Sequence, residues 1–220
     1  MATHLDLEEQ EQLDQVKHFW KQYGNLITWT LIAALAVYAG FNGWNWWQRE
    51  QGLKAGALYE ELDRAAQAGD VERASRAFDD LKERYPRALY AQQGGLLAAK
   101  VQFEKGRAEE ARASLAWVAD GAREAAYRTA ARLRLAGLLL DAKQYDQALA
   151  QLAQADAKEF QALVADRRGD ILLASGNADA AKAAYREAWQ GFEPDIDYRR
   201  LVEAKLIALG AAPAAPKTAP

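Results

Sequence analysis

The sequence predicts an all-α protein with one N-terminal transmembrane helix, a stack of about four helix pairs and a capping helix. Three observations predict this fold class. About 27 residues from Gln22 to Gln48 carry no charge. From Gly52 onward, alanine, leucine, glutamate, lysine and arginine dominate, which favours helix throughout. Small and large apolar residues then recur together at a nearly constant interval, which is typical of stacked helix pairs.

The uncharged stretch has the length of a transmembrane helix. Because a helix rises about 1.5 Å per residue, roughly 20 apolar residues cross a hydrocarbon core about 30 Å thick. Tyr23 and Trp44 lie 21 residues apart, and their rings favour the two headgroup layers. We therefore predict a short acidic tail over residues 1–22 and a transmembrane helix over residues 23–47. A buried core helix and a cleaved signal peptide are the alternatives.

The charges around this stretch leave its orientation nearly undecided. Lys17 and Lys21 precede it, whereas Arg49, Lys54 and Arg64 follow it, so the positive-inside rule gives almost a tie. A short tail is easily retained, and a large domain can be exported whatever its charge. We therefore expect the N-terminus in the cytoplasm and the helical domain outside, with the reverse orientation as the alternative.

Composition excludes several classes of function. The net charge of −3 resides in the first 48 residues, and the remainder is neutral with 26 basic and 26 acidic residues. A neutral domain offers no electrostatic footprint for nucleic acid. The absence of cysteine removes disulfides, thiolate zinc sites and cysteine nucleophiles. Both histidines, His4 and His18, lie in the acidic tail. No phosphate loop or nucleophile motif occurs. We expect no enzymatic activity, no catalytic, cofactor-binding or metal-ligating residues, no cofactor and no small-molecule substrate.

Four aligned segments indicate an internal repeat. Small residues recur with spacings of 37, 37 and 33, at Ala74, Ala111, Ala148 and Ala181. Four positions after each stands a large apolar residue: Phe78, Leu115, Leu152 and Tyr185. Five positions before three of the alanines stands a glycine: Gly69, Gly106 and Gly176. Lys143 takes that place in the remaining segment.

This spacing is the pattern of a tetratricopeptide-like repeat, in which helix, turn and helix occupy about 34 residues. The glycine ends the first helix in a left-handed cap, the alanine lets the two helices approach, and the large residue fills the groove one turn later. We predict a tetratricopeptide-like α-solenoid over residues 49–209, with Asp195 to Leu209 as its capping helix. The Ala/Pro-rich residues 210–220 are expected to be disordered. A nonrepeating helical bundle is the alternative.

The chain resembles the family of ancillary subunits of the SecYEG translocon. The likeness covers nearly the whole chain and lies first in its layout of acidic tail, one span and repeats. The span ends in a Trp-rich exit, Gly43-Trp44-Asn45-Trp46-Trp47. The likeness is most specific in Leu133-Arg134-Leu135-Ala136, in Lys143-Gln144 and Ala148-Leu149 that follow, and in the run from Val164 to Gly176. The proline-rich end is outside the family pattern.

The resemblance implies a noncatalytic, membrane-tethered adaptor in the bacterial inner membrane, with a cytoplasmic N-terminus and periplasmic repeats. It implies binding to the SecYEG translocon and to a membrane-anchored periplasmic chaperone of the prolyl-isomerase-like type, assisting newly exported proteins. The lipid bilayer, which one span crosses, is a further expected partner, and nucleic acid is not. A membrane-anchored structural scaffold with cytoplasm-facing repeats is the alternative.

In tetratricopeptide folds generally, certain positions of each first helix face a concave groove. On this chain they are Tyr59, Asp63, Gln93, Leu96, Lys100, Phe103, Leu133, Leu140, Leu163, Asp166, Asp170 and Leu173. This mixed, partly apolar set predicts a groove that holds a hydrophobic segment or helix. A groove filled by the chain's own capping helix is the alternative. Four arginines are either anchors for a partner carboxylate or members of interhelix salt bridges: Arg132, Arg134, Arg167 and Arg168.

Overall fold

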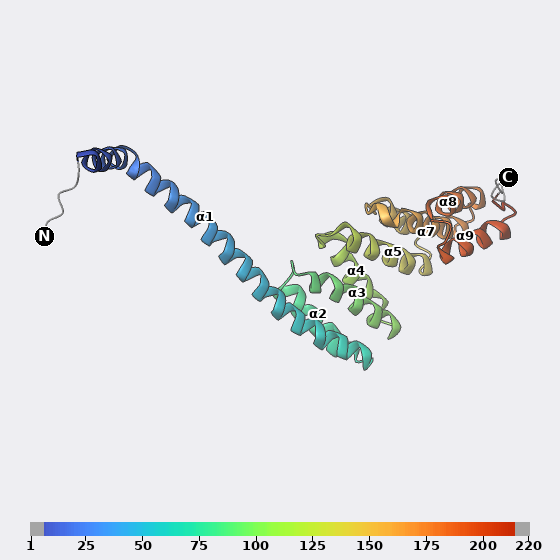
Figure 1. Cartoon of the computed structure of the whole chain (residues 1–220). Coiled ribbons are helices and arrows are strands. Elements are labelled where there is room, and N and C mark those ends of the chain that lie inside the picture. The colour runs from blue at the N-terminus through green and yellow to red at the C-terminus, as the bar shows by residue number, and fades with distance from the viewer. Residues whose placement is uncertain (1–6, 214–220) are drawn as a thin grey trace, which may run out of the picture. The chain divides into compact units, whose positions relative to one another are not determined.

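The computed structural model describes residues 7–213. In this range every regular element is helical (Figure 1). The elements are α1 (Leu7–Gln67), α2 (Val71–Arg84), α3 (Leu89–Glu104), α4 (Ala108–Gly121), α5 (Ala125–Asp141), α6 (Tyr145–Ala153), the 3₁₀ turn η1 (Lys158–Phe160), α7 (Gln161–Ala174), α8 (Ala178–Gly191) and α9 (Asp197–Ala208). They divide into two compact units, Met1–Gln51 and Gly52–Pro220.

The first unit consists of the N-terminal part of α1. Within the described residues, α1 is the one helix that is long and apolar enough to cross a membrane. Polar side chains in this stretch bond to their own helix, as where Thr28 Oγ1 donates to the Gly24 carbonyl at 2.7 Å. Such bonds satisfy polar groups that would be costly to bury unpaired in hydrocarbon. Aromatic pairs stand near both ends of the stretch, Phe19 with Tyr23 and Trp44 with Trp47.

Part of the predicted acidic tail also belongs to this helix. Residues from Leu7 onward are in α1, because leucine, glutamate and glutamine are all good helix formers. His4 lies outside the described residues.

The second unit stacks its helices in chain order. The last part of α1 packs with α2 and α3 through a buried cluster that includes Leu62, Phe78 and Ala98. From α2 to α9, each α-helix contacts the next one along the chain, and Figure 1 shows this succession. The second unit is therefore the predicted all-α stack of helix pairs.

Each first helix of a pair ends in the same left-handed turn. The predicted glycines have positive φ angles of 67°, 78° and 89°, at Gly69, Gly106 and Gly176. Lys143 adopts the same conformation with a φ of 58°. At each turn this residue's N–H bonds to the carbonyl three positions earlier, and the next N–H bonds to the carbonyl five positions earlier. A further copy ends α9 at Gly210 (φ 67°).

The predicted repeat register is confirmed by burial. The aligned alanines are 0% exposed: Ala74, Ala111, Ala148 and Ala181. The large residues that follow them are at most 4% exposed: Phe78, Leu115, Leu152 and Tyr185. Close helix approach at the alanines and filled grooves one turn later are therefore features of all four pairs.

A capping helix closes the stack, as the sequence predicts. α9 buries Val202 and Leu206 in a cluster with Tyr185 and Ala188 of α8. We predict this helix from Asp195 to Leu209; it begins two residues later, at Asp197, and ends one residue earlier, at Ala208. Of the tail expected to be disordered, residues 214–220 lie outside the described residues.

Candidate functional site

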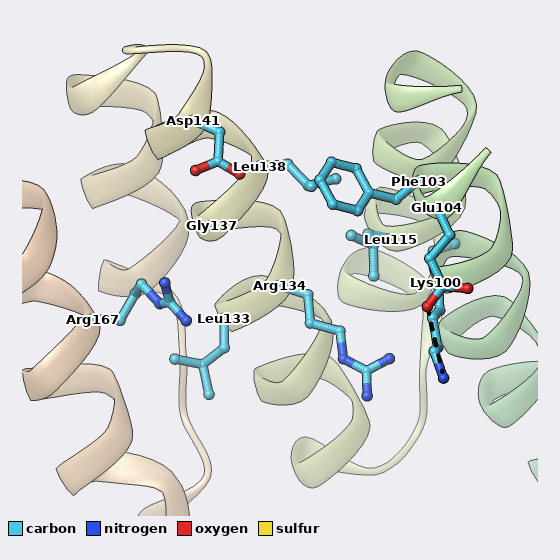
Figure 2. Close-up of a pocket in the computed structure, with 11 residues that line it drawn as sticks. Lys100, Phe103, Glu104, Leu115, Leu133, Arg134, Gly137, Leu138, Asp141 and Arg167 are labelled. Atoms are coloured by element: carbon cyan, nitrogen blue, oxygen red, sulfur yellow. Dashed lines mark ion pairs between the residues drawn. The ribbon is translucent and has the colours of Figure 1, made fainter. Parts of the chain in front are cut away.

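A pocket of about 340 Å³ opens between α3 and α5 (Figure 2). Much of its lining is apolar and includes Phe103, Leu115, Leu133 and Leu138. Phe103 remains 46% exposed. A large apolar side chain left open beside a hollow is typical of a surface that receives a partner. We refer to this hollow as the α3–α5 pocket.

Three cationic side chains border the α3–α5 pocket: Lys100, Arg134 and Arg167. Arg134 of α5 donates from Nη1 to the Leu96 carbonyl of α3 at 3.1 Å. This bond holds the guanidinium across the gap between the two helices. In the view of Figure 2, the charged ends of Arg134 and Lys100 both lie below Phe103, away from Asp141.

Two carboxylates also border the pocket. Glu104 lies 3.9 Å from Lys100 and partly offsets its charge. Asp141 lies toward the opposite end from Arg134, on the side of Phe103 and Leu138 (Figure 2). The pocket is therefore apolar in its middle, with most of its positive charge at one end and a carboxylate at the other.

The α3–α5 pocket brings together three of the residues predicted to face a groove: Lys100, Phe103 and Leu133. The others are spread over the same set of helices, with Tyr59 and Asp63 on α1, Gln93 and Leu96 on α3, Leu140 on α5, and Leu163, Asp166, Asp170 and Leu173 on α7. Some of these have neighbours within the chain. The Tyr59 ring lies 5.5 Å from the Tyr90 ring, and Gln93 Nε2 donates to Tyr127 Oη at 2.8 Å.

Asp166 and Asp170 are engaged by the chain's own capping helix. Asp166 is 2% exposed and accepts hydrogen bonds from Tyr198 Oη and Lys205 Nζ of α9, both at 2.8 Å. Asp170 accepts from Lys205 Nζ at 2.7 Å and from Tyr185 Oη at 2.9 Å. Burial and the Asp166 carboxylate raise the pKa of Tyr198 to about 12. Burial and Asp170 likewise raise the pKa of Tyr185. At these two positions, α9 occupies the space beside α7.

The four arginines considered as anchors divide into two kinds. Arg132 is buried and donates to the Ala119 carbonyl at 3.1 Å, which ties α5 to α4. Arg168 pairs with Glu187 of α8. Arg134 and Arg167 instead border the α3–α5 pocket.

Eight residues of the pocket lie outside the set predicted to face the groove: Ala99, Glu104, Leu115, Arg134, Gly137, Leu138, Asp141 and Arg167. One feature of the sequence, Gly137, could have indicated the position of the pocket. Gly137 stands six positions before the turn at Lys143, as Lys100 stands six before Gly106. A missing side chain at a groove position leaves space there. Within residues 7–213, no group of three or more histidine, aspartate and glutamate side chains is placed to hold a metal ion.

Residues 17–211 match the family described as a tetratricopeptide repeat-like domain. The chain is also similar to three proteins named ancillary SecYEG translocon subunit. The one from Neisseria gonorrhoeae is 30% identical over 95% of this chain and 100% of its own length. The one from Haemophilus influenzae is 30% identical over 84% and 90% of the two chains. The one from Escherichia coli is 26% identical over 86% and 89%. The chain thus belongs to the ancillary SecYEG translocon subunit family.

Proposed function

We propose that this chain is a single-pass protein of the bacterial inner membrane that associates with the SecYEG translocon as a noncatalytic adaptor. The observation that carries the proposal is the full-length similarity to the Neisseria gonorrhoeae protein, which is named for this role. The match extends over the apolar part of α1 as well as the helix pairs, so it includes both the candidate anchor and the candidate binding surface.

The proposed layout places residues 1–22 in the cytoplasm, residues 23–47 in the bilayer and residues 49–209 in the periplasm. The aromatic pairs and the satisfied polar side chains of α1 support the span. The ease with which a short tail is retained supports the orientation. A scaffold with cytoplasm-facing repeats would need the opposite layout.

The proposed adaptor uses the concave positions of the first helices to hold a partner. The open apolar surface at Phe103 and Leu133 supports this role. We also propose that a second partner is a membrane-anchored periplasmic chaperone of the prolyl-isomerase-like type, so that the adaptor serves newly exported proteins. The resemblance in sequence is what supports this second partner.

Two measurements on the full-length chain test the proposal. A phosphatase that folds in the periplasm, fused after Pro220, is expected to be active. A green fluorescent protein fused at the same place and exported by the same route is expected to be dark. The chain is expected to copurify with SecYEG from membranes dissolved in mild detergent. Cytoplasmic reporter activity would favour the scaffold. Correct topology without SecYEG in the purified fraction would overturn the adaptor role.

A further inference from the structure

The α3–α5 pocket has an uneven distribution of charge that its own side chains do not balance. In the described part of the chain, the Leu96 carbonyl is the hydrogen-bond partner of Arg134, and it neutralises no charge. Lys100 has Glu104 at 3.9 Å. The Arg134 end of the pocket therefore carries net positive charge beside an apolar surface.

Arg167 is the third cation that lines the pocket. Its Nη1 lies 3.9 Å from Asp170 Oδ2. That carboxylate is already shared, because its other oxygen lies 2.7 Å from Lys205 Nζ. Lys205 also pairs with Asp166 at 2.8 Å, so two aspartates share two cations, and Arg167 has the longest of these contacts. The guanidinium also lies 3.8 Å from the position that a Cβ on Gly137 would take, so the absent side chain at Gly137 leaves it open to the pocket.

We propose that the α3–α5 pocket binds a segment of a partner protein that presents a large apolar side chain next to a carboxylate. The apolar side chain packs between Phe103 and Leu133. The carboxylate is bound by Arg134, with Arg167 as the second cation. This inference rests on the proposed adaptor function and specifies the chemistry of its partner.

Charge complementarity selects this occupant. An arginine fork binds a carboxylate through two parallel hydrogen bonds, and such bonds are stronger where apolar neighbours reduce the access of water. A purely apolar segment would leave Arg134 desolvated with only a carbonyl as its partner, which is costly. The exposed rims at Phe103 and Arg134 make the pocket an open groove, which fits a polypeptide lying across it better than a lipid chain inserted into it.

Asp141 gives the bound segment a direction. It lies seven residues beyond Arg134 on α5, about 10 Å along the helix axis. A helical segment bound with its C-terminal end at Arg134 places its N-terminal end near Asp141. That direction suits the helix dipole at both ends.

The experiment uses the full-length chain in native membranes with a photoreactive phenylalanine analogue, benzoylphenylalanine, at position 103. After irradiation, the attached peptide is identified by mass spectrometry. We expect a peptide with an aspartate or glutamate within about one helical turn of a large apolar residue. Arg134→Glu should lower the yield of this product about tenfold or more, as expected for loss of a charge-assisted hydrogen bond. Arg134→Lys should retain part of it.

Matched variants isolate the charge. Arg186→Glu changes an exposed arginine on α8, outside the pocket, and should leave the yield unchanged. Arg134→Gln removes the charge without reversing it, and circular dichroism of each variant checks that it folds. Replacing the identified carboxylate by lysine should abolish the product with the wild-type chain and restore it with Arg134→Glu.

Three outcomes would overturn the inference: no polypeptide product from position 103, a lipid as the captured molecule, or a yield that Arg134→Glu and Arg167→Glu leave unchanged. These outcomes are separate from failure of the adaptor role, which is measured by copurification of the wild-type chain with SecYEG. A chain that copurifies with SecYEG but loses no product in Arg134→Glu would refute the pocket assignment alone.

Discussion

The ring of Tyr185 in α8 lies so close to Gly169 in α7 that a Cβ at position 169 would stand 2.5 Å from it. Tyr185 is 1% exposed, so the ring has no space into which to move. We therefore expect Gly169→Ala to lower the free energy of unfolding by about 1–3 kcal/mol, measured by urea denaturation of the full-length chain in detergent. Gly121→Ala is the control, because its Cβ would meet nothing within 4 Å. Equal midpoints for the two variants would contradict this packing.

The left-handed turn at Lys143 carries a backbone cost that the glycine turns avoid. A side chain at a φ of 58° is strained by about 1–2 kcal/mol. Part of the gain from glycine is offset by its greater entropy in the unfolded chain. We expect Lys143→Gly to raise the free energy of unfolding by about 0.5–1 kcal/mol. Gly106→Ala should instead lower the free energy of unfolding, because its Cβ would meet no neighbouring atom but the strain of the positive φ would remain. A fall in the denaturation midpoint of Lys143→Gly would refute the argument.

Removal of Lys205 should loosen α9. The substitution Lys205→Met leaves the buried Asp166 carboxylate with Tyr198 but without its cation. Breaking one side of a buried ion pair costs about 3–5 kcal/mol, and the partial exposure of Lys205 places the expected loss at the lower end. Amide hydrogen exchange should increase first in α9. Lys182→Met, which breaks an exposed pair with Asp179, should change stability by less than about 1 kcal/mol. Similar effects from both variants would show that burial of Asp166 does not matter.

Stability should decline in alkaline solution partly through Tyr198. Its pKa rises from an ordinary value of 10.0 to about 12 on folding, mainly because the hydroxyl is buried and donates to Asp166. Between these two values the unfolded chain loses this proton while the folded chain keeps it, so the contribution to stability is complete below pH 10 and is lost toward pH 12. At pH 8 the free energy of unfolding of the wild type should exceed that of Tyr198→Phe by about 1 kcal/mol. This difference should narrow as the pH rises from 10 to 11. A constant difference in urea denaturation across that range would contradict the assignment.

Local chemistry made the helix stack predictable from the sequence. Alanine at each close contact and a large residue one turn later are short-range requirements that hold in all four pairs, and glycine stands at three of the four turns. Even Lys143, which lacks glycine's conformational freedom, follows the repeat, because the packing of α5 and α6 imposes the turn. Tertiary contacts here outweigh the local preference of one residue.

The segment after α6 could not be predicted in the same way. No glycine or proline marks the chain between Ala153 and Gln161. Side chains from α5 instead hold it: Arg128 bonds to Asp156 at 2.5 Å, and Thr129 accepts from the Ala157 N–H at 3.1 Å. These partners lie 28 residues apart in sequence, so no local pattern reveals them.

The candidate site shows the same limit. The positions that face the groove in tetratricopeptide folds include Phe103 and Leu133, and both residues line the α3–α5 pocket. The same positions include Asp166, whose carboxylate is buried against Lys205 of the capping helix, 39 residues later. From residue type alone, Arg132 and Arg134 have the same two interpretations. They differ by two positions and therefore point to opposite sides of α5, Arg132 into the core and Arg134 to the pocket. Only the three-dimensional arrangement of neighbouring helices separates these cases.

The turn that ends α1, α3, α5, α7 and α9 is the same pair of backbone hydrogen bonds each time. These helix-ending turns therefore have the same backbone geometry. A helical hairpin cut out between two of them leaves flanking backbone angles that already match, so the array can be shortened or lengthened in whole modules. A single residue inserted within a helix has no such solution, because it rotates the later side chains of that helix by about 100° and turns their alanines away from the neighbouring helix. Natural variation in the length of this architecture should therefore proceed by duplication of entire hairpins.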